Sequence, residues 1–284
     1  MEQPQLGGRV AVVTGAASGI GLDLATKAAA LGMRVVMADI EKAALDEAAA
    51  TVGADGAKVL AIATDVSDAE SMQQLATEAE DTFGPAWLVC NNAGVAGGGL
   101  AWEIPHSTWE WVLGVNLWGV IHGIAAFVPG MVGRGEGHVV NTASMAGLLA
   151  SPGMAAYGAS KHAVVAISES LYHDLQLMGS GVGVSVLCPG FVNTRIADAD
   201  RNWPSHLGPV PVAETNPMAE LIREALQARL AGGMSPSEVA DKVFDAVAGR
   251  RFWVLPHADE YAAPVRARFA NAIEEHNPDP FQFQ

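Results

Sequence analysis

The sequence predicts an α/β protein built on a doubly wound parallel sheet of about seven strands, with helices on both faces. Short β-branched runs alternate with helical stretches along most of the 284 residues, and this alternation is typical of parallel sheets. A glycine-rich turn joins the first strand to the first helix. Hydrophobic residues make up 50% of the chain, which is enough for a large core.

Strands and helices alternate regularly in the first half of the chain. Strands are predicted over 9–13, 34–38, 58–64 and 86–90, and helices over about 22–31, 41–52 and 67–83. Gly32 is predicted to be the C-cap of the first helix. Ser67 and Glu70 have the spacing of a capping box, which predicts the start of the third helix. Each helix then joins two parallel strands in a βαβ unit.

The second half continues the alternation with one interruption. Strands are predicted over 138–142, 182–188 and 252–255, and helices over 107–131, about 155–178, about 218–230 and from 235 onward. Two of these helices begin with predicted capping boxes, Ser107 with Glu110 and Ser235 with Glu238. Pro236 supports the second of them because proline suits the first position of a helix.

We expect one domain over 1–284, with a core of about 7–255. Prolines interrupt the pattern between 195 and 235. An irregular insertion beside a ligand-binding edge is usually a substrate-binding loop or lid, although an ordinary surface loop is the alternative. Residues 256–284 are predicted to form a C-terminal extension that ends in a non-helical tail.

Polar residues and a proline follow the predicted strands at their carboxyl ends. They are Asp39, Asp65, Asn91, Ser144 and Pro189. In an open parallel sheet these ends share one edge, and ligands bind there. We therefore expect the functional site along this edge.

The glycine-rich turn has the pattern of a dinucleotide-binding loop. Gly15 would permit the tight turn, Gly19 the close approach of a pyrophosphate, and Gly21 the packing of helix on strand. The N–H groups at the start of the following helix would bind the phosphates. Asp39, at the tip of the second strand, is placed to accept hydrogen bonds from an adenosine ribose. The alternative for Asp39 is a cap for the next helix.

Tyr157 and Lys161 lie one helical turn apart in an otherwise apolar stretch. An ammonium near a phenol favours the phenolate, so we expect the lysine to lower the tyrosine pKa by roughly 1 to 3 units. The phenol would then be able to exchange a proton near neutral pH. The alternative is a buried aromatic ring beside a lysine that reaches to solvent.

Composition argues against several other classes of protein. The net charge of −15 disfavours binding to nucleic acid or to an anionic membrane. The N-terminus lacks the pattern of a signal peptide, so a cytoplasmic location is expected. The eight histidines show no metal-site spacing, and we expect no metal. Cys90 and Cys188 are predicted to be free, buried thiols.

Taken together, the motifs resemble those of the classical short-chain dehydrogenases/reductases over about residues 7–255. The matching elements are Thr14-Gly15-x-x-x-Gly19-Ile20-Gly21, Asp65, Asn91-Asn92-Ala93-Gly94, Asn116, Ser144, Tyr157-x-x-x-Lys161 and Pro189-Gly190-x-x-x-Thr194. The resemblance implies a Rossmann-type fold, a nicotinamide cofactor, and hydride transfer between it and an alcohol or carbonyl carbon.

The resemblance also implies a role for each site residue. Tyr157 would be the general acid or base, Lys161 would lower its pKa, and Ser144 would donate a hydrogen bond to the substrate oxygen. Asn116 would hold a water that links Lys161 to solvent. A helix kink at Asn116 and a turn hydroxyl at Ser144 are the structural alternatives.

The cofactor is predicted to be NAD rather than NADP. Its expected contacts are Gly15, Ser18, Gly19, Ile20, Gly21, Asp39, Asp65, Val66, Asn92, Ala93, Gly94, Tyr157, Lys161, Pro189, Gly190, Val192 and Thr194. Asp39 would repel a 2′-phosphate. Ser18 is not the basic residue that NADP-preferring relatives usually have there, and only Lys42 argues the other way.

The substrate is predicted to be a hydrophobic or aromatic secondary alcohol or ketone. The expected pocket residues are uncharged: Leu100, Trp102, Met145, Leu149, Met154, Phe191, Ile196 and Trp203. Core packing is the alternative for each of them. Apolar faces on the helices at 107–131 and 155–178 favour a homotetramer or homodimer. The alternative function is a catalytically idle sensor or scaffold that binds NAD.

Overall fold

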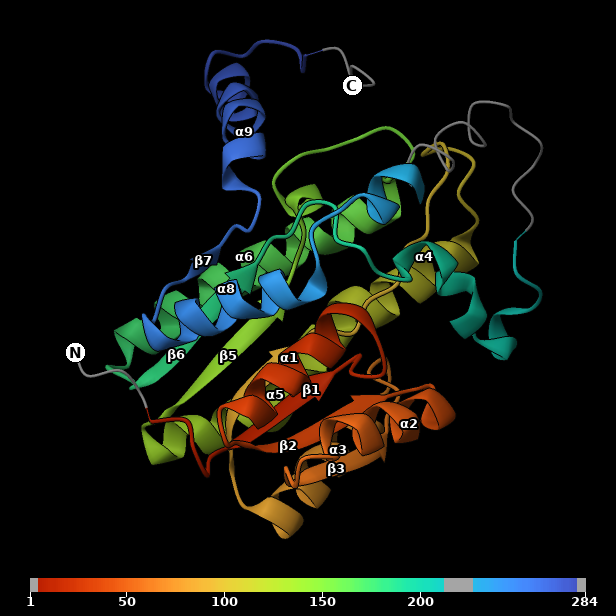
Figure 1. The fold of residues 1–284 in the computed structure, drawn as a ribbon. Coiled ribbons are helices and arrows are strands. Elements are labelled where there is room, and N and C mark those ends of the chain that lie inside the picture. Colours follow the sequence, from red (N-terminus) through yellow and green to blue (C-terminus); the bar gives the residue numbers. More distant parts are fainter. Residues whose placement is uncertain (1–4, 212–226, 280–284) are drawn as a thin grey trace.

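The computed structural model describes residues 5–211 and 227–279. These residues form a seven-stranded sheet in the order β3-β2-β1-β4-β5-β6-β7, and every neighbouring pair is parallel. The strands are β1 Val10–Thr14, β2 Arg34–Asp39, β3 Val59–Ala63, β4 Ala86–Asn91, β5 Gly137–Thr142, β6 Val182–Leu187 and β7 Trp253–Val254. The predicted doubly wound α/β fold is confirmed (Figure 1).

The strand order reverses between β1 and β4. From β1 the chain moves outward to β3, then crosses back to β4 and continues outward to β7. A crevice forms at such a reversal, outside the carboxyl ends of the strands. The topology therefore directs both halves of the chain toward one edge.

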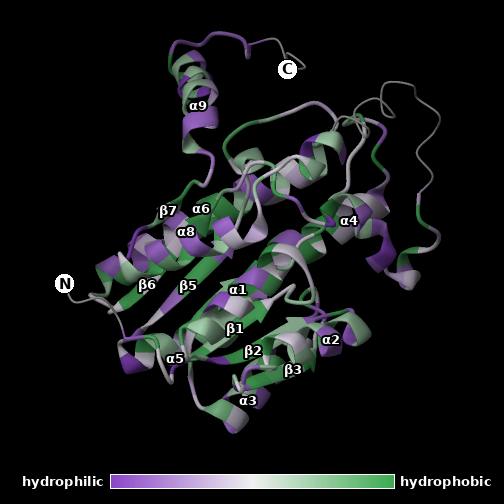
Figure 2. Ribbon diagram, viewed as in Figure 1, coloured by the Kyte–Doolittle hydropathy of each residue, from purple (hydrophilic) through white to green (hydrophobic). Residues whose placement is uncertain are grey.

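Helices cover both faces of the sheet. They are α1 Gly19–Ala30, α2 Lys42–Val52, α3 Ala69–Phe83, α4 His106–Leu113, α5 Gly119–Arg134, α6 Ala155–Leu177, α8 Pro236–Ala248 and α9 Ala258–Ile273. Helices α1, α2 and α8 contribute to one apolar cluster, and α3, α5 and α6 contribute to another. Figure 2 shows the strands between them as mostly hydrophobic.

Alternation along the strands explains these two clusters. On β1, Ala11 and Val13 belong to the cluster with α1 and α8, while Val10 and Val12 belong to the cluster with α3 and α5. Successive strand side chains point to opposite faces, so an apolar run such as 10–13 supplies both cores. All of these side chains are at least 97% buried, Val10 being the most exposed at 3%.

Two of the three predicted capping boxes are wrong. Helix α3 begins after Asp68, whose carboxylate accepts hydrogen bonds from Glu70 N and Ser71 N, because the Ser67 hydroxyl instead donates to Asp65. Helix α4 begins after Pro105 and has no side-chain cap.

The third capping box is confirmed. The Ser235 hydroxyl accepts from Glu238 N, and the Glu238 carboxylate accepts from Ser235 N.

The predicted helix over 107–131 is longer than expected and contains one π-helical turn, Gly114–Trp118. The continuous helical stretch His106–Arg134 has 29 residues and is long and apolar enough to cross a membrane, by length and composition alone. In this fold its α5 part packs on β4 and β5. The stretch is therefore accounted for as a core helix.

Two regions at the carboxyl edge differ from the sequence expectation. The insertion begins with short 3₁₀ turns, Ile196–Asn202 and Ser205–Leu207, and most of the predicted 218–230 helix lies outside the described residues. The C-terminal extension contains an unpredicted helix, α9, which projects from the body in Figure 1. Residues 276–279 are non-helical, and the rest of the predicted tail lies outside the described residues.

Both cysteines are buried and free, as predicted. Cys90 lies on β4 and Cys188 directly follows β6. Strand β5 separates these two strands in the sheet, which places the thiols too far apart for a disulfide.

Candidate active site

A cavity of about 1470 Å³ runs along the carboxyl edge of the sheet. Of the predicted strand-end residues, Asp39, Asp65, Ser144 and Pro189 line it. Asn91 does not, because its side chain is buried and donates to Asn141 Oδ1. Ligand pockets usually occupy about 300 to 1,000 Å³, so this cavity has room for a dinucleotide and a substrate together.

The glycine-rich turn forms one end of the cavity. Gly15 and Gly19 have positive φ angles of 66° and 56°. A Cβ on Gly15 would lie 2.8 Å from Ala93 Cα, and a Cβ on Gly19 would lie 3.0 Å from Thr194 Cγ2. Both positions therefore need glycine for conformation and for space.

Gly21 serves a different purpose from the other two glycines. It does not line the cavity, and a Cβ there would lie 2.0 Å from Gly15 O. It permits the close packing of α1 on the turn, as the sequence predicted. Ser18 is the N-cap of α1 but makes no side-chain cap, so N–H groups of the first turn remain available to an anion.

The carboxyl ends of β1 and β4 form the next part of the cofactor end. Thr14 Oγ1 accepts hydrogen bonds from Asn92 N at 2.9 Å and Ala93 N at 3.1 Å. The predicted contacts Ile20, Val66, Gly94, Val192 and Thr194 also line the cavity. A Cβ on Gly94 would lie 3.4 Å from Asn116 Oδ1 and 3.6 Å from Lys161 Nζ. This part of the wall is thus fixed by the bonds of the Thr14 hydroxyl to the backbone after β4, and Gly94 leaves room for the Asn116 and Lys161 side chains.

Asp39 joins the glycine-rich turn to the segment after β2. Its carboxylate accepts hydrogen bonds from Ala17 N and Glu41 N, each at 3.0 Å. Glu41, and not Asp39, is the N-cap of α2. Lys42, the one residue that argued for NADP, pairs instead with Asp46 Oδ2 at 2.5 Å. The carboxylate of Asp39 therefore faces the cavity without a cationic partner from Lys42.

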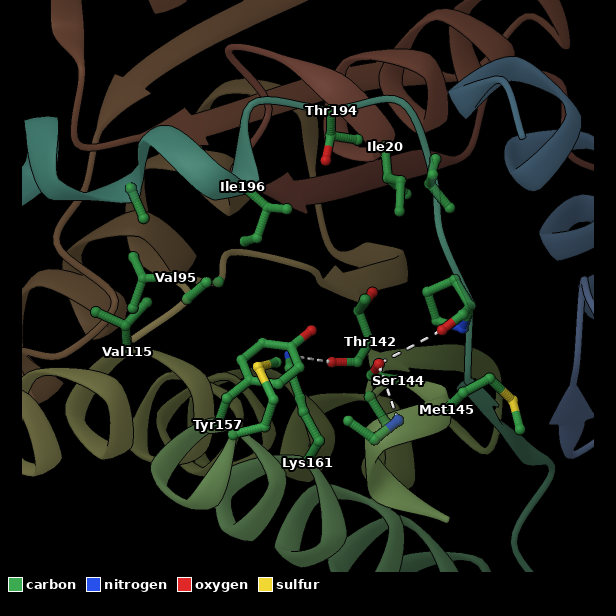
Figure 3. Close-up of a pocket in the computed structure, with 18 of the residues that line it drawn as sticks. Ile20, Val95, Val115, Thr142, Ser144, Met145, Tyr157, Lys161, Thr194 and Ile196 are labelled. Atoms are coloured by element: carbon green, nitrogen blue, oxygen red, sulfur yellow. Dashed lines mark hydrogen bonds between the residues drawn. The ribbon is translucent and has the colours of Figure 1, made fainter. Parts of the chain in front are cut away.

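Tyr157 and Lys161 project from α6 beneath the centre of the cavity, and Ser144 lies beside them (Figure 3). Lys161 Nζ donates to Thr142 O at 2.9 Å and lies 5.6 Å from the centroid of the Tyr157 ring. Ser144 Oγ accepts from Ala146 N at 3.1 Å and donates to Pro189 O at 3.4 Å. Ile20, Thr194 and Ile196 line the opposite wall in the same view.

The protonation of the tyrosine differs from the sequence expectation. Burial raises the pKa of Tyr157 above its ordinary value, and the Ser144 hydroxyl opposes this as a hydrogen-bond partner. Burial also lowers the pKa of Lys161 to about 8. Removal from water disfavours the charged form of each group, so it raises the pKa of the phenol and lowers the pKa of the ammonium.

Asn116 occupies the π-helical turn and is fully buried. Its amide accepts from Val95 N at 2.8 Å and donates to Val95 O at 3.0 Å and Ser160 Oγ at 3.1 Å. It lies behind the cavity wall rather than in it. A helix irregularity is present, as the structural alternative expected, and the water-binding role stays a prediction.

The substrate end contains most, but not all, of the predicted pocket. Met145, Leu149, Met154, Phe191, Ile196 and Trp203 line the cavity. Leu100 and Trp102 do not, and this part of the prediction is wrong. The chain pairs through Gly99 with Met154 and then turns outward, leaving the Trp102 side chain 79% exposed.

Sequence reasoning missed a second group of lining residues. They come from α9 and its surroundings and include charged side chains: Arg229, Glu260, Tyr261, Arg268 and Asn271. Arg268 Nη1 donates to Leu148 O, and Arg229 lies 4.0 Å from Glu260. The apolar positions Tyr261 and Val265, spaced by one helical turn, are the signal that could have revealed α9.

The segment 195–211 is fixed at two points, and we call it the lid segment. Arg201 Nε and Asn202 Nδ2 donate to Glu41 Oε1 at 2.8 and 2.9 Å. Trp203 packs edge-on against Trp111, with ring centroids 5.0 Å apart. The first contact ties the lid segment to the cofactor end, and the second ties it to the substrate end.

Within residues 5–211 and 227–279, no group of three His, Cys, Asp or Glu side chains is arranged to hold a metal ion. One histidine, His138, is buried with its Nε2 atom 2.8 Å from Ser185 Oγ, and burial lowers its pKa to about 3.

Comparison with known proteins gives a consistent result. A family model for the short chain dehydrogenase matches residues 9–205. A 1-deoxy-11-beta-hydroxypentalenate dehydrogenase from Streptomyces arenae is 41% identical over 92% of this chain and 85% of its own. A dehydrogenase/reductase of CLA biosynthesis from Lactiplantibacillus plantarum is 32% identical over 95% of each chain.

A solved structure from Burkholderia phymatum, a short chain dehydrogenase/reductase in complex with NAD, is 44% identical. It covers 99% of this chain and 100% of its own, with a TM-score of 0.95.

Proposed function

Because the chain belongs to the short-chain dehydrogenase/reductase family, we propose that it interconverts a secondary alcohol and a ketone with Tyr157 as the acid and base. It is an oxidoreductase, and its cofactor is NAD. The observation that carries the proposal is the convergence of Tyr157, Ser144 and Lys161 on one cavity with the glycine-rich turn. A bound nicotinamide would supply the hydride acceptor for alcohol oxidation and, in its reduced form, the hydride donor for ketone reduction.

The protein's own groups handle the proton and the developing charge. In oxidation the Tyr157 phenolate takes the hydroxyl proton, and in reduction the phenol returns it. Ser144 Oγ donates a hydrogen bond to the substrate oxygen, where negative charge develops. Lys161, anchored on Thr142 O at 2.9 Å, supplies positive charge beside the phenolate. Asn116 supports α6 through Ser160 at 3.1 Å.

The cofactor residues fit a dinucleotide along the whole edge. Gly15, Gly19 and the start of α1 would hold the pyrophosphate, and Asp39 the adenosine ribose. Pro189, Gly190 and Thr194 would contact the nicotinamide end. We propose that NAD is preferred over NADP, because Asp39 presents a carboxylate where the 2′-phosphate would lie.

We propose a substrate with a hydrophobic or aromatic body. Met145, Leu149 and Ile196 provide an apolar wall beside Tyr157. The hydroxypentalenate relative is named for a hydroxy compound, which is consistent with alcohol oxidation. We propose that the lid segment closes this side of the cavity. We also propose that the whole chain forms a single domain.

Exposed aromatic surface supports the proposal of a homotetramer or homodimer. Trp118, on the helix predicted to pair across subunits, is 52% exposed. We propose a cytoplasmic enzyme, since the acidic net charge favours solubility.

The competing function is a protein of this fold that binds NAD without turnover. The presence of both Tyr157 and Lys161 in the cavity favours catalysis over that alternative.

The test is a screen of the purified protein with NAD and a panel of secondary alcohols, followed by the absorbance of the reduced nicotinamide. We expect turnover of aryl or alicyclic alcohols. Binding of NAD with no turnover across the panel, in either direction, would favour the idle sensor. Much faster turnover of polyhydroxylated substrates would contradict the proposed substrate class.

A further inference from the structure

In the C-terminal extension, the side chain of His257 makes two polar contacts with the turn that follows β6. This residue directly precedes α9 and is half-buried. Gly190 N donates to His257 Nδ1 at 3.0 Å, and His257 Nε2 lies 3.1 Å from Phe191 O. Both ring nitrogens therefore contact the backbone of the turn that follows β6.

These two contacts fix the protonation state of the ring. A backbone N–H can only donate, so Nδ1 must carry a lone pair. A carbonyl oxygen can only accept, so Nε2 must carry the proton. Neutral imidazole with its proton on Nε2 satisfies both contacts, and an imidazolium would place two N–H groups against each other. The turn is thus bound to one tautomer of His257.

The same turn is held from two other sides. Met145 N donates to Pro189 O at 2.9 Å, and Met234 N donates to Phe191 O at 3.0 Å. A Cβ on Gly190 would lie 2.8 Å from Tyr261 Cε2 and 3.0 Å from His257 Cγ. No side chain fits between the turn and the C-terminal extension. His257 and Tyr261 therefore pack directly against the backbone of the turn at Gly190.

The turn also reaches the reacting groups. Pro189 O accepts from Ser144 Oγ at 3.4 Å, and Pro189, Gly190 and Phe191 line the cavity beside Tyr157. A shift of the turn would move both the Ser144 hydroxyl and the wall that we assign to the nicotinamide. Displacements of about 1 Å at such sites can cost two orders of magnitude in rate.

We propose that neutral His257 is a positioning residue that holds the Pro189–Phe191 turn at the height required for nicotinamide binding and hydride transfer. The inference rests on the proposed function, since it uses the assignment of this turn to the nicotinamide end. It gives the C-terminal extension a role in the reaction: the extension carries the group that fixes one wall of the site.

The charged neighbours do not replace this role. Arg229 Cζ lies 4.7 Å from the Phe191 ring centroid and its guanidinium pairs with Glu260 at 4.0 Å. Tyr261 meets the His257 ring edge-on, with centroids 6.4 Å apart. Each of these residues packs near the turn, but within the described part of the chain Gly190 N donates its hydrogen bond to His257 Nδ1 and to none of them.

Two substitutions separate the hydrogen bonds from the packing. His257→Phe keeps a ring but removes both bonds, and we expect NAD to bind roughly tenfold more weakly, with a loss of kcat of similar size. His257→Asn retains an acceptor near the Nδ1 position, and we expect about half of that loss, on a logarithmic scale, to be recovered. Binding is measured by titration calorimetry, independently of turnover.

Val265→Ala is the matched control. Val265 anchors α9 on the core cluster around Cys188 but does not line the cavity. If His257 only anchors α9, the Val265 and His257 variants will both lower the melting temperature and leave the NAD affinity of the folded protein unchanged. That outcome would overturn the proposal.

Nitrogen NMR of the wild-type histidines gives a second, direct readout. We expect His257 to show an unprotonated Nδ1 and a protonated Nε2 at neutral pH, with the signal assigned from its loss in His257→Phe. A proton on Nδ1 would contradict the geometry. If the wild type binds no NAD at all, the proposed function fails. If it binds NAD and His257→Phe binds equally well, only this inference fails.

Discussion

The two ends of the cavity are built from different kinds of contact. At the cofactor end, the motifs at neighbouring strand tips bond to one another: Asp39 accepts from Ala17 N and Glu41 N, and Thr14 accepts from Asn92 N. At the substrate end, the walls come from the lid segment, from α9 and from the loop after Ser144, which are distant in sequence.

Because of this difference, the sequence specifies the cofactor end more closely than the substrate end. The cofactor end consists of short motifs at the tips of parallel strands, so its chemistry follows from local geometry. The substrate end depends on how distant segments pack, and each of its residues has an ordinary structural use as well. Single substitutions can therefore disturb the two ends separately.

Tyr157→Phe should abolish most turnover and leave the cofactor end intact. The ring still packs on α6, but the group that exchanges the proton is lost, and such groups contribute about 10² to 10⁴ in rate. NAD binding, measured by calorimetry, should remain close to that of the wild type. A variant that retains most of its kcat would show that the proton is exchanged elsewhere.

Asp39→Ala should change the choice of cofactor without changing the substrate. Two negative groups a few ångströms apart repel by a few kcal/mol at an effective dielectric constant of about 20, less in salt. We therefore expect the wild type to prefer NAD by roughly 10² in kcat/KM, and the variant to lose most of that preference. Equal use of both cofactors by the wild type would contradict the role of Asp39. An unchanged cofactor preference in the variant would mean that Asp39 serves only to bind the Ala17 and Glu41 N–H groups.

Lys161→Met should lose activity and gain stability at pH 7. Burial lowers the lysine pKa from 10.5 to about 8, so between these values the unfolded state binds more protons and the wild type gains stability as pH rises. Below pH 8 the buried charge costs the folded state roughly 3 kcal/mol. Removing it, together with its bond to Thr142 O, should stabilise the variant by roughly 1 to 3 kcal/mol.

The measurement is urea unfolding of both proteins at pH 7 and pH 9, compared as a difference. The difference matters because burial raises the pKa of Cys90 and Cys188 to about 12, which lowers the stability of both proteins above about pH 9. The gap between variant and wild type should narrow as pH rises from 8. A gap that stays constant would mean that Lys161 is not buried as a cation.

Arg201→Gln and Glu41→Gln test the smallest effect, the link between the two ends. The pair is only about one quarter exposed, at 25% and 26% for the two side chains. We expect each variant to raise the KM for alcohol several-fold with little change in kcat, because the lid segment loses its anchor. The double variant should show a coupling of about 1 kcal/mol. Strict additivity would show that the lid segment does not depend on this contact.

The fold was predicted from the sequence, and most of the residues predicted to bind the cofactor line the cavity. The positions of these residues follow from the strand pattern. Asp39, Asp65 and Ser144 come directly after predicted strands, and Gly15 and Gly19 form the turn after the first strand, so a parallel sheet brings all of them to one edge. The tyrosine pKa was predicted in the wrong direction. Pairwise charge can be read from the spacing of Tyr157 and Lys161, but desolvation depends on the packing of the whole cavity.

Only part of the substrate end could be predicted from the sequence, because its walls depend on how distant segments pack. Leu100 and Trp102 are apolar and adjacent to the site in sequence, yet neither lines the cavity, because the chain turns away after Gly99 pairs with Met154. Arg268 and His257 are distant in sequence and reach the site because α9 and the segment before it pack there. The residues around Arg268 and His257 carry no local sequence pattern that predicts this packing.

The most direct test of the account is the transfer of deuterium. The wild-type protein is incubated with NAD and a secondary alcohol deuterated at the carbinol carbon, and the reduced cofactor is analysed by mass spectrometry. The account predicts deuterium on the reduced nicotinamide and a slower reaction than with the unlabelled alcohol. Bound NAD that acquires no deuterium from any aryl, alicyclic or aliphatic alcohol would contradict it.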